Sequence, residues 1–247
     1  GGIGNEELYD HTQKISVNIP LNIKANLLLL TGLDVYTSAS TDNINNEHDL
    51  LVETSASYKD SRKYTDIGLQ LIGKENTVLG VNSGFSKEWD VYSENIGLSL
   101  GAFSKNKNTK LKLTATYYKD DWEMIYPLEL RPTLITNEQT DYKTRKVYDF
   151  SCTISQVINK RLKIALALQT VYQKGLLSTP FHRVYFSDTT HTIEKLPNNR
   201  LKTPIGLHGS YYINDWSIFK AFYRFYKDDF GITAHTIEIE TPIKIPE

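Results

Sequence analysis

Apolar and polar side chains alternate along most of this chain, and this period of two constrains its fold more than any other feature. Leu162, Ile164, Leu166 and Leu168 fall at every second position, with Lys163 and two alanines between them. Successive side chains of a strand point to opposite faces, so such a segment has one apolar face. No segment shows a helical period of 3.6 residues. The sequence therefore predicts an all-β protein.

The alternation divides the chain into eleven predicted strands. They span approximately residues 11–19, 23–38, 64–73, 77–86, 92–104, 109–119, 144–158, 162–176, 202–213, 217–227 and 231–245. Most are about 10 to 16 residues long, whereas strands of soluble sheets are mostly about 5 to 6. A tilted strand needs about 9 to 11 residues to cross a bilayer. Strand length therefore favours a membrane barrel.

The connections between the predicted strands alternate between two kinds. Short turns lie at residues 20–22, 74–76, 105–108, 159–161 and 214–216. Connections of a second set, three of them long and polar, lie at residues 39–63, 87–91, 119–143, 177–201 and 228–230. Outer-membrane barrels sort their connections in this way, with tight turns in the periplasm and long loops outside. We therefore predict one transmembrane antiparallel up-and-down β-barrel domain over residues 1–247, in the outer membrane of a Gram-negative bacterium.

The predicted strand count is odd, whereas an antiparallel sheet that closes within one bacterial chain needs an even number. A short strand at Leu50–Tyr58 would make the count even, but it would place its neighbours on the wrong sides. Residues outside the given chain, or a second chain, would also supply the missing pairing. We expect twelve or more strands in the complete protein.

Aromatic residues gather near the ends of the predicted strands. They are Tyr36, Tyr64, Trp89, Tyr92, Tyr117, Trp122, Tyr172, Tyr211, Trp216, Tyr226 and Phe230. Their amphipathic rings suit the headgroup region, so we interpret them as two interfacial girdles in contact with the lipid bilayer. The alternative is that they form the core of a soluble all-β binding domain.

Charge and motifs exclude several function classes. With 28 basic and 29 acidic side chains, the chain offers no patch that would track nucleic-acid phosphates. One cysteine and six scattered histidines lack the spacing of metal ligands, and we expect no cofactor. No Gly-x-Ser-x-Gly elbow or phosphate-binding glycine loop occurs, so we do not expect an enzyme. The longest apolar run, Ile164–Leu168, is far too short for a membrane helix.

The register of the strands predicts a set of polar side chains that face the barrel lumen. They are Lys24, Asn26, Asp34, Asp66, Gln70, Asn82, Asn95, Lys110, Lys112, Asp149, Lys163, Gln169, His208, Lys220, Arg224, Glu238 and Glu240. If the last hairpin turns about Asp229, Lys220 lies opposite Glu238. This lining either conducts solutes or merely fills a plugged interior with salt bridges.

Two similar tetrapeptides occur at the outer ends of predicted strands. They are Lys119-Asp-Asp-Trp122 and Lys227-Asp-Asp-Phe230. Two carboxylates are too few for calcium, which takes six to eight oxygen ligands. We therefore expect these aspartates to be solvated residues at loop tips.

Several segments resemble an uncharacterised Gram-negative outer-membrane β-barrel family that is catalogued only as a domain of unknown function. They are Arg183-Val-Tyr-Phe, Lys195-Leu-Pro-Asn-Asn-Arg, Tyr211-Tyr, the Tyr223–His235 segment, Tyr58–Tyr64 and Tyr117–Trp122. The resemblance implies the fold and the location, further strands beyond Ile245, and a loose association with periplasmic redox and flavin-transfer proteins. It implies no catalytic residues.

Three functions are compatible with the sequence. The first is a passive, porin-like pore or conduit for small solutes. The second is a non-conducting scaffold that docks lipoproteins or periplasmic proteins, and the third is a soluble all-β binding domain. The residues do not identify a solute or a partner.

Overall fold

The computed structural model describes residues 9–37, 59–74, 77–126, 140–188 and 190–244. Eleven long strands follow one another, and each pairs antiparallel with its neighbours along the chain. They are β1 (Asp10–Asn22), β2 (Ala25–Thr37), β3 (Lys59–Ile72), β4 (Thr77–Lys87), β5 (Val91–Phe103), β6 (Thr109–Ile125), β7 (Thr140–Val157), β8 (Leu162–Gly175), β12 (Ile205–Asn214), β13 (Ser217–Lys227) and β14 (Thr233–Glu240). Within the described ranges the chain forms no helix, and hence none long and apolar enough to cross a bilayer.

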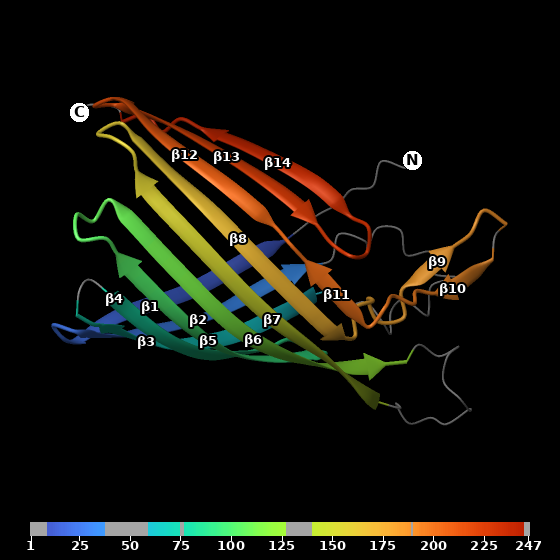
Figure 1. Ribbon diagram of the computed structural model, residues 1–247. Helices are drawn as coiled ribbons and strands as arrows, with labels where there is room; N and C mark the ends of the chain where they lie inside the picture. Colours follow the sequence, from blue (N-terminus) through green and yellow to red (C-terminus); the bar gives the residue numbers. More distant parts are fainter. Residues whose placement is uncertain (1–8, 38–58, 75–76, 127–139, 189, 245–247) are drawn as a thin grey trace.

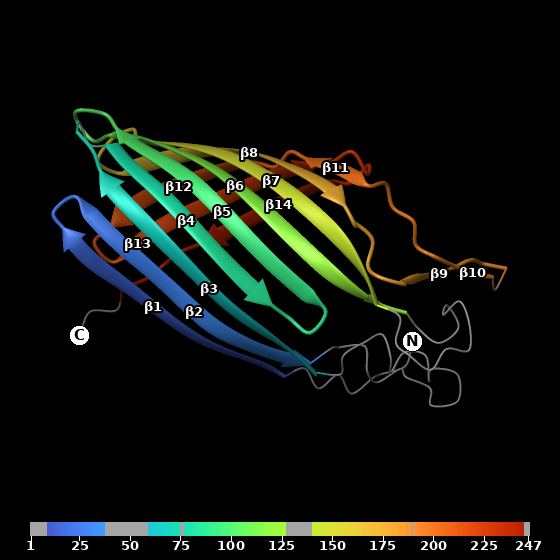
Figure 2. The same cartoon turned by 90° about the horizontal axis from the view of Figure 1, so that it is seen from below.

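Three short strands lie in the connection between β8 and β12. β11 (Asn199–Lys202) pairs with β8 and lengthens the main sheet, while β9 (Arg183–Tyr185) and β10 (His191–Ile193) form a separate hairpin. Figures 1 and 2 show the main sheet as a curved wall, with β1 and β14 at its two edges. These two edge strands are not paired with each other in the described part of the chain.

The predicted eleven strands and their antiparallel order are confirmed, but three of them extend several residues into predicted external loops. β3 begins at Lys59, β6 has 17 residues and β7 has 18, so residues 59–63, 119–125 and 140–143 belong to strands rather than to external loops. The strands continue because polar side chains at their ends, such as Asp120, find partners on the neighbouring strand. The possible strand at Leu50–Tyr58 lies outside the described residues.

Two of the predicted three-residue turns are two-residue turns, and in each a bulge in the first strand precedes the turn. The β1–β2 turn is formed by Ile23 and Lys24, and the register of the two strands shifts between Pro20 and Asn22. The β12–β13 hairpin has the same arrangement, with a shift between Tyr212 and Asn214. A bulge adds one residue to one strand, so the side chains beyond it lie on the same faces as a three-residue turn would place them.

The apolar side chains lie on one face of the sheet and remain exposed. On β5, the exposed fractions of Ile96 and Leu98 are 55% and 59%. Among the described residues, only Ala25 and Met124 are buried apolar side chains. A β-sandwich would instead bury its apolar faces between two sheets. The described residues therefore form a single sheet with an uncovered apolar face.

Candidate functional site

The face opposite the apolar side chains is polar, and it is the concave face of the curved sheet. Asn95 on β5 donates a hydrogen bond of 3.3 Å to Asp66 on β3, although β4 lies between these two strands. Side chains converge in this way on the inner side of a curved sheet. The residue between them is Gly84, and a Cβ atom at this position would overlap the Asp66 carboxylate. Glycine therefore permits a hydrogen bond that spans three strands.

The strand register places all of the predicted lumen-facing residues on this concave face except Lys24. Lys24 lies in the β1–β2 turn and is exposed at the end of the sheet. The predicted pairing of Lys220 with Glu238 is wrong. Lys220 lies opposite Glu240, and its Nζ is 3.1 Å from Oε2 of Glu240.

The register of this last hairpin differs by two residues because its connection is two residues longer than predicted. The connection runs from Asp228 to Ile232 and is centred on Phe230 rather than on Asp229. Gly231 has a φ of 87°, a left-handed conformation that glycine adopts without strain. The backbone N–H of Ile232 donates to the Asp228 carboxylate across the turn, at 2.9 Å.

The middle of the concave face is lined by hydrogen-bonded polar groups. Nε2 of Gln169 on β8 donates to both carboxylate oxygens of Asp149 on β7, at 3.0 and 2.8 Å. On β12 and β13, the rings of His208 and Phe222 stack with their centroids 4.2 Å apart. The lining is therefore partly ordered by its own contacts.

A first charged cluster lies where β5, β6 and β7 approach the long connections. Nε of Arg145 donates to Asp120 at 2.7 Å, and the Ser93 hydroxyl donates to the other carboxylate oxygen at 2.6 Å. The Asp120 residue is only 6% exposed. The Arg145 guanidinium also lies 5.4 Å from the centre of the Trp122 ring, within the range of a cation–π contact. The guanidinium is therefore held both at its edge and on its face.

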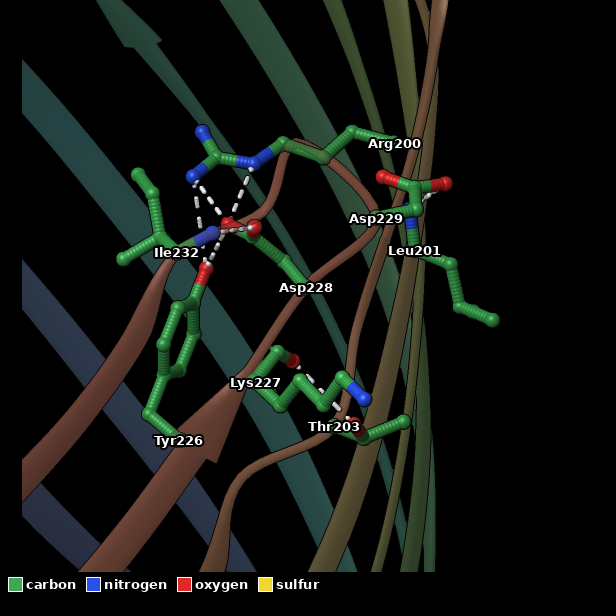
Figure 3. A network of polar contacts seen from close by, with 8 residues as sticks. All are labelled: Arg200, Leu201, Thr203, Tyr226, Lys227, Asp228, Asp229 and Ile232. Carbon is green, nitrogen blue, oxygen red and sulfur yellow. Dashed lines mark hydrogen bonds and ion pairs between the residues drawn. The ribbon is translucent and has the colours of Figure 1, made fainter.

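A second cluster repeats this arrangement between β11 and the β13–β14 connection (Figure 3). The Asp228 carboxylate accepts hydrogen bonds from Nε and Nη2 of Arg200 and from the Tyr226 hydroxyl. The guanidinium of Arg200 lies 4.7 Å from the centre of the Phe230 ring. As in the first cluster, an aspartate binds the arginine and an aromatic ring two residues after that aspartate stacks on it.

The hydrogen bonds of the second cluster lower the pKa of its aspartate, Asp228. Burial alone raises the pKa of Asp228, but the hydrogen bonds from Arg200, Tyr226 and the Ile232 backbone outweigh it and lower the pKa to about 2. The side chain of Asp228 is fully buried. This carboxylate is therefore ionised under ordinary conditions and acts as a fixed anchor for Arg200.

The prediction that both tetrapeptides carry solvated tip aspartates is wrong for the first aspartate of each. Asp120 and Asp228 are buried in the two clusters. The second aspartates lie at the surface, where Asp121 binds Lys119 and Asp229 accepts a hydrogen bond of 3.0 Å from the Leu201 backbone. The repetition of the tetrapeptide was the signal for the clusters, but the sequence does not indicate which arginines complete them.

The predicted aromatic residues divide between the two faces. Tyr117 and Tyr172 lie on the apolar face, where they form a row with Tyr148, which was not predicted; the ring centroids are 5.2 and 6.3 Å apart. Four predicted members of the girdles instead belong to the concave face, opposite the apolar side chains. These four are Tyr36, Tyr64, Trp122 and Tyr226. A position near the end of a strand does not determine on which face of the sheet the side chain lies.

No three histidine, cysteine, aspartate or glutamate side chains of the described residues are arranged to hold a metal ion.

Comparison with solved structures places the sheet among outer-membrane β-barrels. A ferric enterobactin receptor mutant (PfeA, G324V) from Pseudomonas aeruginosa superimposes with a TM-score of 0.59 at 11% identity, over 98% of this chain and 40% of the receptor. The siderophore receptor PirA from Acinetobacter baumannii gives 0.58 at 10% identity, over 98% of this chain and 39% of the receptor. The chain thus spans about two fifths of the length of these receptors. The likeness confirms the predicted fold class.

Family membership comes from the sequence. No curated protein matches the chain. The model of a family described as "protein of unknown function (DUF3570)" matches residues 37–247, which is most of the chain. The predicted resemblance to an uncharacterised family is confirmed, and the chain belongs to the DUF3570 family.

Proposed function

We propose that this sheet is part of the wall of a barrel in the outer membrane of a Gram-negative bacterium, and that small polar solutes diffuse passively along its concave face. The observation that carries the proposal is the contrast between the two faces. Each square ångström of apolar surface left in water costs about 25 cal/mol, so an apolar face as exposed as that of Ile96 and Leu98 requires a cover. Lipid is the cover that a single curved sheet of long strands fits.

The concave face supports conduction rather than mere filling. Lys112 and Lys163 project from it, and neither has an ion pair or hydrogen bond among the described residues. A plugged interior would pair such charges, because a charge withdrawn from water without a partner is strongly unfavourable. Water along this face would keep both ammonium groups solvated.

Planar-bilayer recording of the full-length protein tests the proposal. We expect a stable ion current, and we expect Lys163→Glu to raise its preference for cations, because the charge lines the path. Lys24→Glu is the matched control, since Lys24 changes the net charge equally but lies in a turn at the end of the sheet. Silence at all voltages, or an equal effect of both variants, contradicts a conducting lumen.

A second candidate function is a non-conducting scaffold that docks lipoproteins or periplasmic proteins. The outer edges of β1 and β14 have no pairing partner among the described residues, which favours this function, because backbone groups in a bilayer need hydrogen-bond partners. All thirteen residues of β1 are exposed. A protein that gives no current, but cross-links through cysteines placed along β1 to another outer-membrane or periplasmic polypeptide, would support this function over the conduit.

A further inference from the structure

Three basic side chains lie on the concave face of neighbouring strands at the two charged clusters. Lys202 lies on β11 opposite Val171 of β8, and Arg200 lies two residues before it on the same face. Arg145, from the first cluster, is on β7 beside β8. The positive charges of Arg200 and Arg145 and the negative charge of Asp228 all act on the Lys202 ammonium. The two clusters therefore share one electrostatic environment.

Of these three basic side chains, Lys202 is the one that has no ion pair among the described residues. Asp120 pairs with Arg145, and Asp228 pairs with Arg200. The carboxylate in register with Lys202, that of Asp149 on the other side of Val171, accepts two hydrogen bonds from Gln169 instead. The Lys202 side chain is half-buried and has no hydrogen bond or ion pair within the part of the chain that the structure describes. A partly desolvated ammonium beside two guanidinium groups is unfavourable unless an anion joins it.

The first cluster holds its arginine so that donors remain available. Only Nε of Arg145 is bonded to Asp120, and neither Nη group makes a hydrogen bond within the described ranges. The Trp122 ring on one face of the guanidinium limits its rotation. A planar guanidinium with two free Nη groups binds a phosphate or carboxylate through two parallel hydrogen bonds.

Trp122 supplies an independent observation. Its indole Nε1 is shielded from solvent and has no hydrogen-bond partner among the described residues. Buried donors in native proteins almost always have an acceptor, and those without one require a specific explanation. An oxyanion bound beside Arg145 would bring an acceptor to the same corner of the sheet.

We propose that Lys202, Arg145 and Arg200 form an anion-binding subsite on the concave face, near the long connections, for a small solute that carries a phosphate or carboxylate group. Asp120 and Asp228 position the two arginines, and Lys202 provides the charge that the anion neutralises. The inference rests on the proposed function, because it names the class of solute that the conduit selects. It also explains why the same aspartate–arginine–aromatic arrangement occurs twice around one lysine.

Binding of inorganic phosphate and of succinate to the full-length protein in detergent tests the subsite. Calorimetry measures the affinity directly, so the result does not depend on whether the protein conducts. We expect at least one of the two anions to bind, and Lys202→Gln to weaken its binding about tenfold or more, the loss typical of a charge-assisted hydrogen bond. Which anion binds distinguishes phosphate from carboxylate recognition.

Two further variants separate a site from general electrostatics and from misfolding. Lys163→Gln removes the same charge from the same face of neighbouring β8 and should leave the affinity unchanged. Lys202→Arg retains the charge and should retain the affinity within about threefold. The subsite is overturned if neither anion binds, if Lys163→Gln weakens binding as much as Lys202→Gln, or if Lys202→Gln binds as the unmodified protein does. Binding without ion current would instead leave the subsite intact and overturn the conduit.

Discussion

The ion pair between Asp120 and Arg145 should stabilise the sheet more than a pair of equal length on the opposite face. Its N–O distance is 2.7 Å, and only 8% of the Asp120 side chain and 31% of the Arg145 side chain are exposed. Breaking a fully buried pair costs about 3–5 kcal/mol, whereas exposed pairs contribute about 0–1 kcal/mol. Since Arg145 retains some contact with solvent, we expect a coupling free energy of about 2 kcal/mol between the two side chains.

A double-mutant cycle measures this coupling. Asp120→Ala, Arg145→Ala and the double variant are unfolded with urea from lipid vesicles, and the free energies of unfolding are compared. The matched control is the pair between Lys119 and Asp121, which has the same length of 2.7 Å but lies on the outer face of β6 with more than a quarter of each side chain exposed. Its cycle should give a coupling close to zero.

Equal couplings in the two cycles refute this expectation, because the stabilisation would then depend on the geometry of the ion pair alone and not on its burial on the concave face. A coupling near zero in both cycles would also contradict the assignment of Asp120 as an anchor for Arg145. Retention of far-ultraviolet circular dichroism in every variant ensures that folded states are compared.

Three further predictions concern Asp228 in the β13–β14 connection, Gly84 below the Asp66–Asn95 hydrogen bond, and the apolar face. Because the pKa of Asp228 falls from 3.8 to about 2 on folding, its contribution to stability is complete above pH 3.8 and is lost as the pH falls toward 2; urea midpoints of the unmodified protein and of Asp228→Asn should therefore converge over that interval. Gly84→Leu should lower the free energy of unfolding by about 1–3 kcal/mol by displacing the carboxylate beside it, whereas Gly209→Leu, with nothing within 4 Å of its Cβ position, should not. Leu98→Arg should destabilise the membrane-inserted state by about 2–4 kcal/mol, and the same change at its inward-facing neighbour Ser99 should cost less, as vesicle-refolding titrations would measure.

The faces of the strands were predictable because one physical rule determines them. In β8, Leu162, Ile164, Leu166 and Leu168 alternate with small or polar residues, and a shift of one position would exchange the two faces. The same rule identified the polar side of the wall, including Asp66 and its neighbours on the concave face. The face of each side chain is predicted correctly even where the turn length is wrong, because a bulge adds back the one residue that the shorter turn lacks.

The charged clusters were not predictable, because they depend on which residues meet across strands. Asp120 was assigned to a loop since aspartate is common in turns, yet Arg145 on the next strand extends the pairing past it. The partner of Asp228 is Arg200, 28 residues away on a strand of four residues that the alternation does not reveal. The positive φ of Gly231, which sets the register of the last hairpin, is likewise a property of one turn.

The odd number of long strands has a geometric consequence for the two edges of the wall. Each of the ten junctions from β1 to β14 reverses the chain direction, so the first and last strands run the same way. If these two edges joined directly, the seam would be the one parallel pairing in an otherwise antiparallel cylinder. A cylinder that is antiparallel throughout requires an odd number of additional strands between them, whichever polypeptide contributes those strands.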